Sequence, residues 1–96
     1  MNHESKKIAF IGGGMVAEAI IRGLILHGHS PMSIFVSDPS KKRRELLAVL
    51  NGRLNIEKDN NIVAEVCDIL VLALKPQIFV SVAEKIVETH TKNDSI

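Results

Sequence analysis

The sequence predicts an α/β fold built on a parallel sheet. Four short runs of apolar residues, typical of buried strands, alternate with segments of helical periodicity, and no repeat or low-complexity tract interrupts them. Three consecutive glycines join the first apolar run to the first helical segment. Right-handed crossovers would place about four strands in the order 3-2-1-4 with flanking helices, which is a Rossmann-type sheet.

The first half of the chain is expected to hold two strands and two helices. "KIAFIG" and "SIFVS" are the strands, because both are short apolar runs rich in β-branched and aromatic residues. The first helix is expected from Met15 to about His27, ended by Gly28. The second is expected over about 40–50, with Asp38 as candidate N-cap and Pro39 at the first helical position. The expected inward positions are Val16, Ala19, Ile20, Gly23, Leu24 and Leu26 in the first helix, and Leu46, Leu47 and Leu50 in the second.

The second half is expected to repeat this alternation. "LNIEKD" holds a short third strand, "NIVAEVC" a short helix capped from residues 59–61, and "DILVLAL" a fourth strand. A last helix is expected over about 77–89, with Val80, Ala83, Ile86 and Val87 on one face. The chain ends at "TKNDSI", where a fifth strand would begin. We therefore expect one domain over residues 1–96, truncated before the fifth strand, with an open sheet edge that leads to self-association or low stability.

Composition narrows the class of protein. The 96 residues carry a net charge of +1, with 46% hydrophobic and 24% charged residues, which argues against a nucleic-acid or membrane-surface footprint. No apolar run is long enough for a signal peptide or a membrane span. The single cysteine, Cys67, cannot form an internal disulfide, and no metal-ligand spacing occurs. We expect a cytoplasmic protein in which Cys67, His27 and His29 are structural.

The glycine triplet has the spacing of a dinucleotide-binding turn. Gly12, Gly14 and Ala17 match the pattern GxGxxG/A, in which the glycines permit a tight turn and close approach of a pyrophosphate, and the small third residue lets helix pack on strand. Helix N–H groups and the helix dipole would face the phosphates. A purely structural turn is the alternative. The absence of GK[ST] excludes a nucleoside-triphosphate P-loop.

An acidic residue and a basic run follow the second strand. Asp38 lies 24 residues after Gly14, where a carboxylate can bind an adenosine ribose, although it could instead only cap the next helix. A carboxylate there favours NAD(H), whereas the run Lys41 to Arg44 could reach the 2′-phosphate of NADP(H) or form a solvated helix face. If the turn binds a dinucleotide, the cofactor is expected to be NADP(H) or NAD(H), and the sequence does not decide between them.

Two segments together resemble one family. "IAFIGGGMVAEAIIRGL" is similar to the N-terminal signature of the pyrroline-5-carboxylate reductases, and "DILVLALKPQ" resembles their AVKP segment. The resemblance extends over essentially the whole chain. It differs where the family has Asn-Met after the third glycine, because this chain has Met15 and Val16, which implies weaker cofactor binding.

The resemblance implies cofactor contacts for residues at three strand ends. Lys75 and Pro76 could alternatively be a plain strand terminator. The implied residues are Ile11, Gly12, Gly13, Gly14, Met15 and Val16 around the pyrophosphate; Ser37, Asp38 and Asn60 near the adenosine; and Ala73, Leu74, Lys75 and Pro76 toward the nicotinamide ribose.

The resemblance also implies a reaction and partners. Members of the family reduce the cyclic imine 1-pyrroline-5-carboxylate to L-proline with NAD(P)H, and their C-terminal helical domain binds substrate and forms the dimer. These 96 residues lack that domain and hold no evident catalytic residue, so we expect no turnover by the chain alone. Two alternatives remain, namely another NADP-dependent reductase of the superfamily, such as an F420-dependent one, and a non-catalytic nucleotide-binding or regulatory module.

Overall fold

The computed structural model describes residues 6–73 and 86–87, and the four predicted strands form one parallel sheet. The register pairs Phe10 of the first strand with Val36 of the second and Val71 of the fourth. The order β3-β2-β1-β4 confirms the predicted 3-2-1-4 arrangement. The strands are β1 (Ile8–Ile11), β2 (Ile34–Ser37), β3 (Asn55–Glu57) and β4 (Ile69–Leu72).

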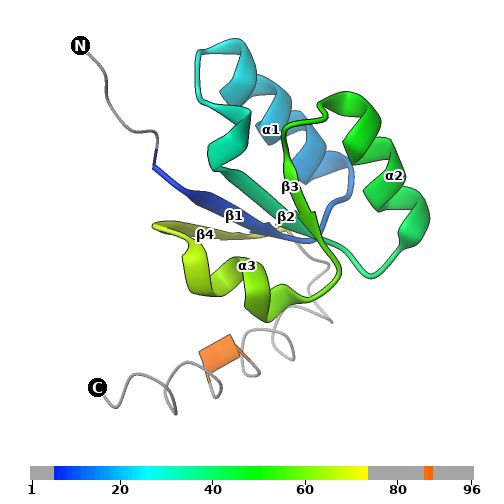
Figure 1. Ribbon diagram of the computed structural model, residues 1–96, viewed down its shortest axis with the longest axis vertical. Coiled ribbons are helices and arrows are strands. Elements are labelled where there is room, and N and C mark those ends of the chain that lie inside the picture. Colours follow the sequence, from blue (N-terminus) through cyan, green and yellow to red (C-terminus); the bar gives the residue numbers. More distant parts are fainter. Residues whose placement is uncertain (1–5, 74–85, 88–96) are drawn as a thin grey trace.

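Helices cover both faces of this sheet. Helices α1 (Met15–Leu26) and α2 (Lys41–Leu50) pack on one face and α3 (Asn60–Val66) packs on the other (Figure 1). A short 3₁₀ turn, η1 (Pro31–Ser33), precedes β2 where the sequence predicted only a turn. Residues 86–87 are helical, as expected, and the rest of the predicted last helix lies outside the described residues. The right-handed crossovers bring the loops after β1, β2 and β3 to one edge of the sheet.

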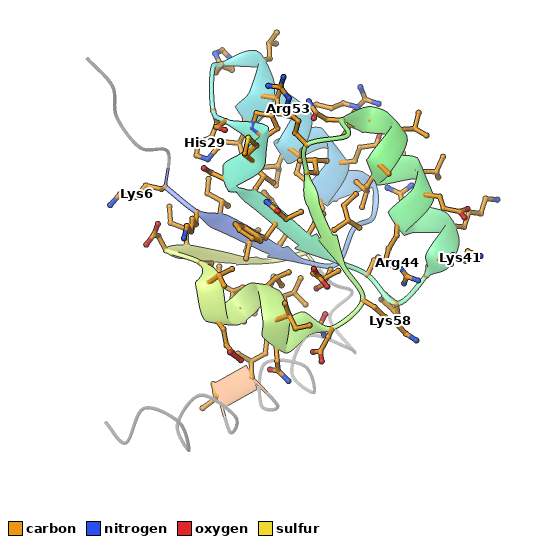
Figure 2. All side chains as sticks on the ribbon, viewed as in Figure 1. Lys6, His29, Lys41, Arg44, Arg53 and Lys58 are labelled. Atoms are coloured by element: carbon orange, nitrogen blue, oxygen red, sulfur yellow. The ribbon has the colours of Figure 1, made fainter. Side chains whose placement is uncertain are left out.

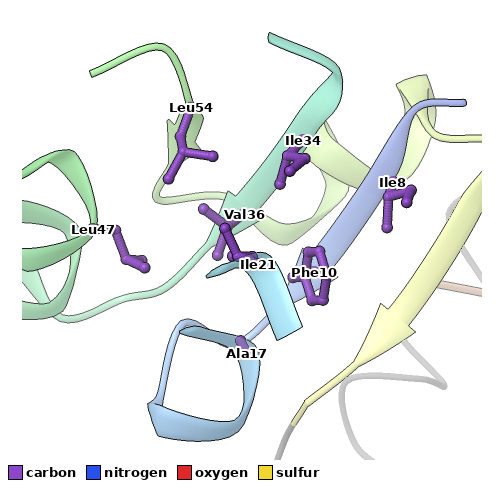
Figure 3. Close-up of a cluster of buried hydrophobic side chains, with 8 residues drawn as sticks. All are labelled: Ile8, Phe10, Ala17, Ile21, Ile34, Val36, Leu47 and Leu54. Atoms are coloured by element: carbon purple, nitrogen blue, oxygen red, sulfur yellow. The ribbon is translucent and has the colours of Figure 1, made fainter. Parts of the chain in front are cut away.

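Two apolar clusters hold the layers together. The larger lies between the sheet and the α1 and α2 layer, and Figure 3 shows its eight buried side chains. The smaller lies on the α3 side and contains Ala9, Ile11, Val63 and Ile86. Successive residues of β1 point to opposite faces of the sheet, so this strand contributes to both clusters and is buried throughout. Strand β1 therefore separates the two apolar clusters and contributes side chains to both.

The predicted inward face of α1 is wrong at Val16, Ala19, Ile20 and Leu26, which are exposed, and right at Leu24. Ala17 and Ile21 are buried and Leu24 and Ile25 pack against the same cluster, whereas Val16 is 67% exposed. Apolar residues surround most of this helix, so periodicity alone did not fix its rotation. The contact of Ala17 with the sheet fixes it, because only a small side chain lets the helix start so close to β1.

Three smaller predictions are also corrected. The N-cap of α2 is Ser40, whose side chain accepts a hydrogen bond from the Arg43 N–H, so Asp38 is not the cap and Pro39 precedes the helix. Leu46 is 47% exposed rather than inward, while Leu47 is fully buried. Val87 is 62% exposed although Ile86 beside it is buried.

Strand β4 occupies one end of the sheet formed by the described residues. Its first two residues, Ile69 and Leu70, are 48% and 37% exposed, unlike the fully covered β1. Self-association through this edge stays a prediction. No helix among the described residues is long and apolar enough to cross a membrane.

Replacing Leu47 tests the larger core. Leu47→Ala should lower the free energy of unfolding by about 2–5 kcal/mol, because it leaves a cavity between α2, the sheet and the glycine loop. Val49, 85% exposed on the same helix, is the matched control, and Val49→Ala should change stability by less than about 0.5 kcal/mol. Urea denaturation followed by circular dichroism measures both, and equal losses would contradict this packing.

Candidate functional site

Gly12 starts the turn out of β1 in a conformation that favours glycine. Its φ is 100°, which side chains with a Cβ rarely adopt. Its N–H donates to the Ser37 carbonyl at 2.8 Å, which ties the turn to the end of β2. The sequence prediction of a tight turn at this glycine is confirmed.

Gly13 is required for packing, which the sequence did not show. A Cβ here would lie 2.7 Å from Leu47 Cδ1 and 3.4 Å from both Asp38 Cβ and Val36 Cγ2. The Gly13 N–H donates to Asp38 Oδ2 at 2.8 Å. The position that the dinucleotide pattern leaves unspecified is thus tightly enclosed by neighbours.

Gly14 is the N-cap of α1 and faces open space. An added Cβ would meet nothing within 4 Å, and no side chain caps the helix. Among the described residues, no hydrogen-bond partner is found for the N–H groups of Gly14, Met15 and Val16. The side chains of Met15 and Val16 are 83% and 67% exposed. The start of α1 therefore offers main-chain donors beside an open surface, which suits an anion.

Both oxygens of Asp38 bind main-chain N–H groups. Oδ2 accepts from Gly13 and Oδ1 accepts from Ser40, each at 2.8 Å. The carboxylate thus joins the glycine turn to the residues before α2. Asp38 therefore has a local structural role. It does not cap α2, as the alternative interpretation of the sequence expected, but binds the N–H of Ser40, which is the cap.

Ser37 and Asn60 come together across 23 residues of sequence. Ser37 is fully buried, and its Oγ donates to Asn60 Oδ1 at 2.7 Å. Asn60 is the first residue of α3, whose N-cap is Asp59. The end of β2 and the start of α3 are therefore held together, as expected if both serve one end of a ligand.

Arg43 anchors the glycine turn from α2. Its Nε donates to the Gly13 carbonyl at 2.7 Å, and its Nη2 pairs with Glu18 Oε1 at 3.0 Å. Glu18 also pairs with Arg22 one turn along α1. Hydrogen bonds from Arg43 and then Arg22 hold the pKa of the Glu18 carboxyl below its ordinary value of 4.5. Sequence reasoning missed this role, since partners 25 residues apart leave no local pattern.

The ends of β1 and β4 are also joined. The Ala73 N–H donates to the Ile11 carbonyl at 2.9 Å, which places Ala73 beside the glycine turn. Leu74, Lys75 and Pro76, the other residues expected on this side, lie outside the described residues.

Cys67 lies away from the loops that follow the strands. It ends α3, half-buried, and its Sγ donates to the Ala64 carbonyl at 3.3 Å. Burial raises the pKa of its thiol, which disfavours the reactive thiolate. Within residues 6–73 and 86–87, no three His, Cys, Asp or Glu side chains are grouped so that they could hold a metal ion.

Sheet order, the positive φ of Gly12 and the uncapped start of α1 define the Rossmann-type class of dinucleotide-binding domains. Residues 7–96 match the family model described as NADP oxidoreductase, coenzyme F420-dependent. The chain belongs to this family.

The chain is similar in sequence to pyrroline-5-carboxylate reductases. That of Pasteurella multocida is 39% identical over 83 residues, and that of Escherichia coli 35% over 92 residues, covering 84% and 95% of this chain. A pyrroline-5-carboxylate reductase structure from Coxiella burnetii has a TM-score of 0.82, with 33% identity over 88% of this chain. A Plasmodium falciparum pyrroline carboxylate reductase structure with NADP bound has a TM-score of 0.73, with 32% identity over 91%.

The chain is much shorter than these relatives. It covers 30% of the Pasteurella multocida protein and 34% of that of Escherichia coli. It also covers 31% and 30% of the two solved chains.

The three glycines should respond differently to substitution. Gly13→Ala should lower the free energy of unfolding by about 1–3 kcal/mol, because the new methyl group meets buried Leu47. Gly14→Ser should leave stability unchanged or raise it, because serine is a favoured N-cap and its Cβ enters open space. Chemical denaturation of both variants measures this, and a Gly13→Ala protein as stable as the unsubstituted one would contradict the enclosed turn.

The ion pairs of Glu18 predict a dependence of stability on pH. Because the pKa of Glu18 is lower in the folded than in the unfolded protein, its contribution is present above pH 4.5 and is lost as pH falls through the folded-state value. Glu18→Gln should therefore be less stable than the unsubstituted protein at pH 7, and the difference should shrink in acid. Denaturation at pH 7 and pH 3 measures it. Glu45→Gln on the exposed side of α2 is the control, and a Glu18→Gln difference that persists undiminished at pH 3 would refute the ion pairs.

Proposed function

We propose that this chain is the NAD(P)H-binding domain of a pyrroline-5-carboxylate reductase, which reduces 1-pyrroline-5-carboxylate to L-proline. The observation that carries the proposal is the uncapped start of α1, where main-chain N–H groups stand beside open space after the positive-φ Gly12. The names of the relatives supply the reaction. The NADP in the Plasmodium falciparum structure supports the choice of cofactor.

The residues of the turn fit a pyrophosphate in distinct ways. The N–H groups of Gly12 and Gly13 are engaged within the protein, so those of Gly14, Met15 and Val16 would bind the phosphates. All three are main-chain donors, so the apolar side chains of Met15 and Val16 do not remove them. Ile11, Gly12 and Gly13 would hold the turn that presents these N–H groups in its conformation.

The remaining residues would line the two ends of the dinucleotide. Ser37, Asp38 and Asn60 would lie beside the adenosine, where β2 and α3 meet. Ala73, next to the end of β1, would lie toward the nicotinamide ribose, followed by Leu74, Lys75 and Pro76. The bound cofactor supplies the hydride for the C=N bond. The contribution of these residues is to position it.

The substrate and partners belong to the whole protein rather than to these residues. The chain covers about a third of its relatives' length, and we propose that a further helical domain binds the imine and forms a homo-oligomer. We also propose a cytoplasmic location, supported by the lone Cys67. Turnover would then require that further domain.

One rival reductase follows from the family description. A member that couples NADP to coenzyme F420 would share this domain. The names of the relatives favour the imine reductase. Assaying the protein, extended by the rest of its gene where that exists, with NADPH and 1-pyrroline-5-carboxylate and separately with NADP and reduced F420 distinguishes the two.

Cofactor binding can be measured on the protein itself. Titration with NADPH and NADH by isothermal calorimetry should show binding of at least one dinucleotide in a 1:1 ratio. Gly14→Ser should weaken that binding at least about tenfold, because its side chain occupies the approach to the N–H groups and its hydroxyl caps them.

A matched control distinguishes a variant that no longer binds the dinucleotide from one that no longer folds. Val49→Ala lies on the outer side of α2 and should bind as the unsubstituted protein does. Failure of the folded, unsubstituted protein to bind either dinucleotide would refute the proposal. Binding without reduction of any imine by the longer protein would favour a non-catalytic nucleotide-binding module.

A further inference from the structure

A groove lies between α1 and α2, the two helices that stand side by side on one face of the sheet (Figure 1). One part of it, of about 500 Å³, is lined by Glu18, Arg22, Leu46, Val49 and Leu50. The other part, of about 350 Å³, is lined by Arg22, Ile25, Leu26, Leu50 and Asn51. Because Arg22 and Leu50 line both parts, the two form one continuous feature, which we call the α1–α2 groove.

The walls of the α1–α2 groove are apolar side chains that the core does not use. Leu26 and Val49 are 81% and 85% exposed, and Leu46 is 47% exposed. Ile21 and Leu47, which are fully buried, make the contacts of the same helices with the sheet. Large aliphatic side chains gathered along both sides of a groove indicate an interaction surface, whereas single exposed ones do not.

The middle of the groove has an excess of positive charge. The Glu18 carboxylate pairs with both Arg22 and Arg43, at 3.0 Å each, so two guanidinium groups share one negative charge. The Arg22 side chain is 61% exposed. Its Nε and Nη2 donate to Glu18 Oε2, and no partner is found for its Nη1 among the described residues. Arg22 can therefore pair with a second carboxylate.

The rim of the groove keeps this excess. Lys42 and Glu45 lie one helical turn before the apolar residues of α2 and add one charge of each sign. Arg53 lies in the turn after α2 (Figure 2), and its N–H donates to Asn51 Oδ1 at 2.8 Å. The groove and its rim thus hold four cations and two carboxylates. Two copies of this surface would bring like charges together, so the charge favours an acidic partner over a second copy of the chain.

We propose that the α1–α2 groove docks an acidic amphipathic helix of a separate protein. The stretch from Glu18 to Leu26 spans about 12 Å of α1, which matches about two turns of a docked helix. Each part of the groove would receive one aliphatic side chain, the two being one turn apart on the docked helix, and a carboxylate between them would pair with Arg22. This is recognition of a helix by a groove, in which apolar anchors supply affinity and charge supplies specificity.

A synthetic peptide tests the chemistry of the partner. The probe is a fluorescein-labelled helical peptide of about 16 residues, with leucines at positions i and i+4 and glutamates beside them. Fluorescence anisotropy at low salt should show saturable binding to the protein. Replacing the glutamates by lysines should weaken that binding at least about tenfold, and replacing the leucines by serines should do the same.

Variants of the protein locate the binding. Val49→Asp should weaken binding of the glutamate peptide at least about tenfold, because it puts a negative charge on the apolar wall. Met32→Asp is the matched control, because Met32 is 65% exposed in η1 and does not line the groove. Arg22→Gln should remove most of the preference for the glutamate over the lysine peptide. Circular dichroism checks that each variant is folded, and peptide-induced changes in amide NMR shifts should lie in α1 and α2.

The other possible occupants give distinct results. Sedimentation of the protein alone should show no dimer that Val49→Asp dissociates, and such a dimer would assign the groove to a second copy and overturn the proposal. Loss of peptide binding in the protein extended by the rest of its gene would assign the groove to that further region and also overturn it.

Binding of the glutamate and lysine peptides with equal affinity, binding unchanged by Val49→Asp, or binding of neither peptide would contradict the proposal directly. None of these measurements uses a dinucleotide, so their outcome is independent of the function proposed above.

Discussion

The loop region of this domain depends on the contact between Gly13 and the end of β2. The Asp38 carboxylate accepts the Gly13 N–H, and Leu47 packs where any side chain at Gly13 would lie. A buried apolar contact and a charge-assisted hydrogen bond thus act on the same residue, one fixing its distance from α2 and the other its orientation. The path of the chain into α1 follows from these two constraints.

Arg43 completes this restraint from the opposite side. Its guanidinium holds the Gly13 carbonyl, while the preceding N–H groups are held by Ser37 and Asp38. With the donors and acceptor of the turn engaged in this way, the next three N–H groups, at the start of α1, are left without a partner among the described residues. An anion site requires such preorganised donors, because ordering them at the moment of binding would lower affinity.

The sequence predicted the strands well and the contacts between loops poorly. Strand positions followed from short apolar runs, which are distinctive where both faces are buried. The rotation of α1 was predictable in principle, because a buried Ala17 implies that Ile21 and Leu24 share its face, but the apolar residues around the helix obscured it. The roles of Gly13 and Arg43 depend on partners about 25 residues away. Only the crossover geometry brings these residues together.

The same geometry separates structural from ligand-binding roles within short stretches of similar residues. Gly12 and Gly13 have engaged N–H groups, whereas no partner is found for the Gly14 N–H among the described residues. In the glycine triplet, the residues that build the support therefore stand directly beside the one whose N–H would contact a ligand. A dinucleotide that binds here would therefore meet donors whose positions are already fixed by their neighbours. The residue type alone does not distinguish the two roles, whereas the hydrogen bonding of each glycine N–H group does.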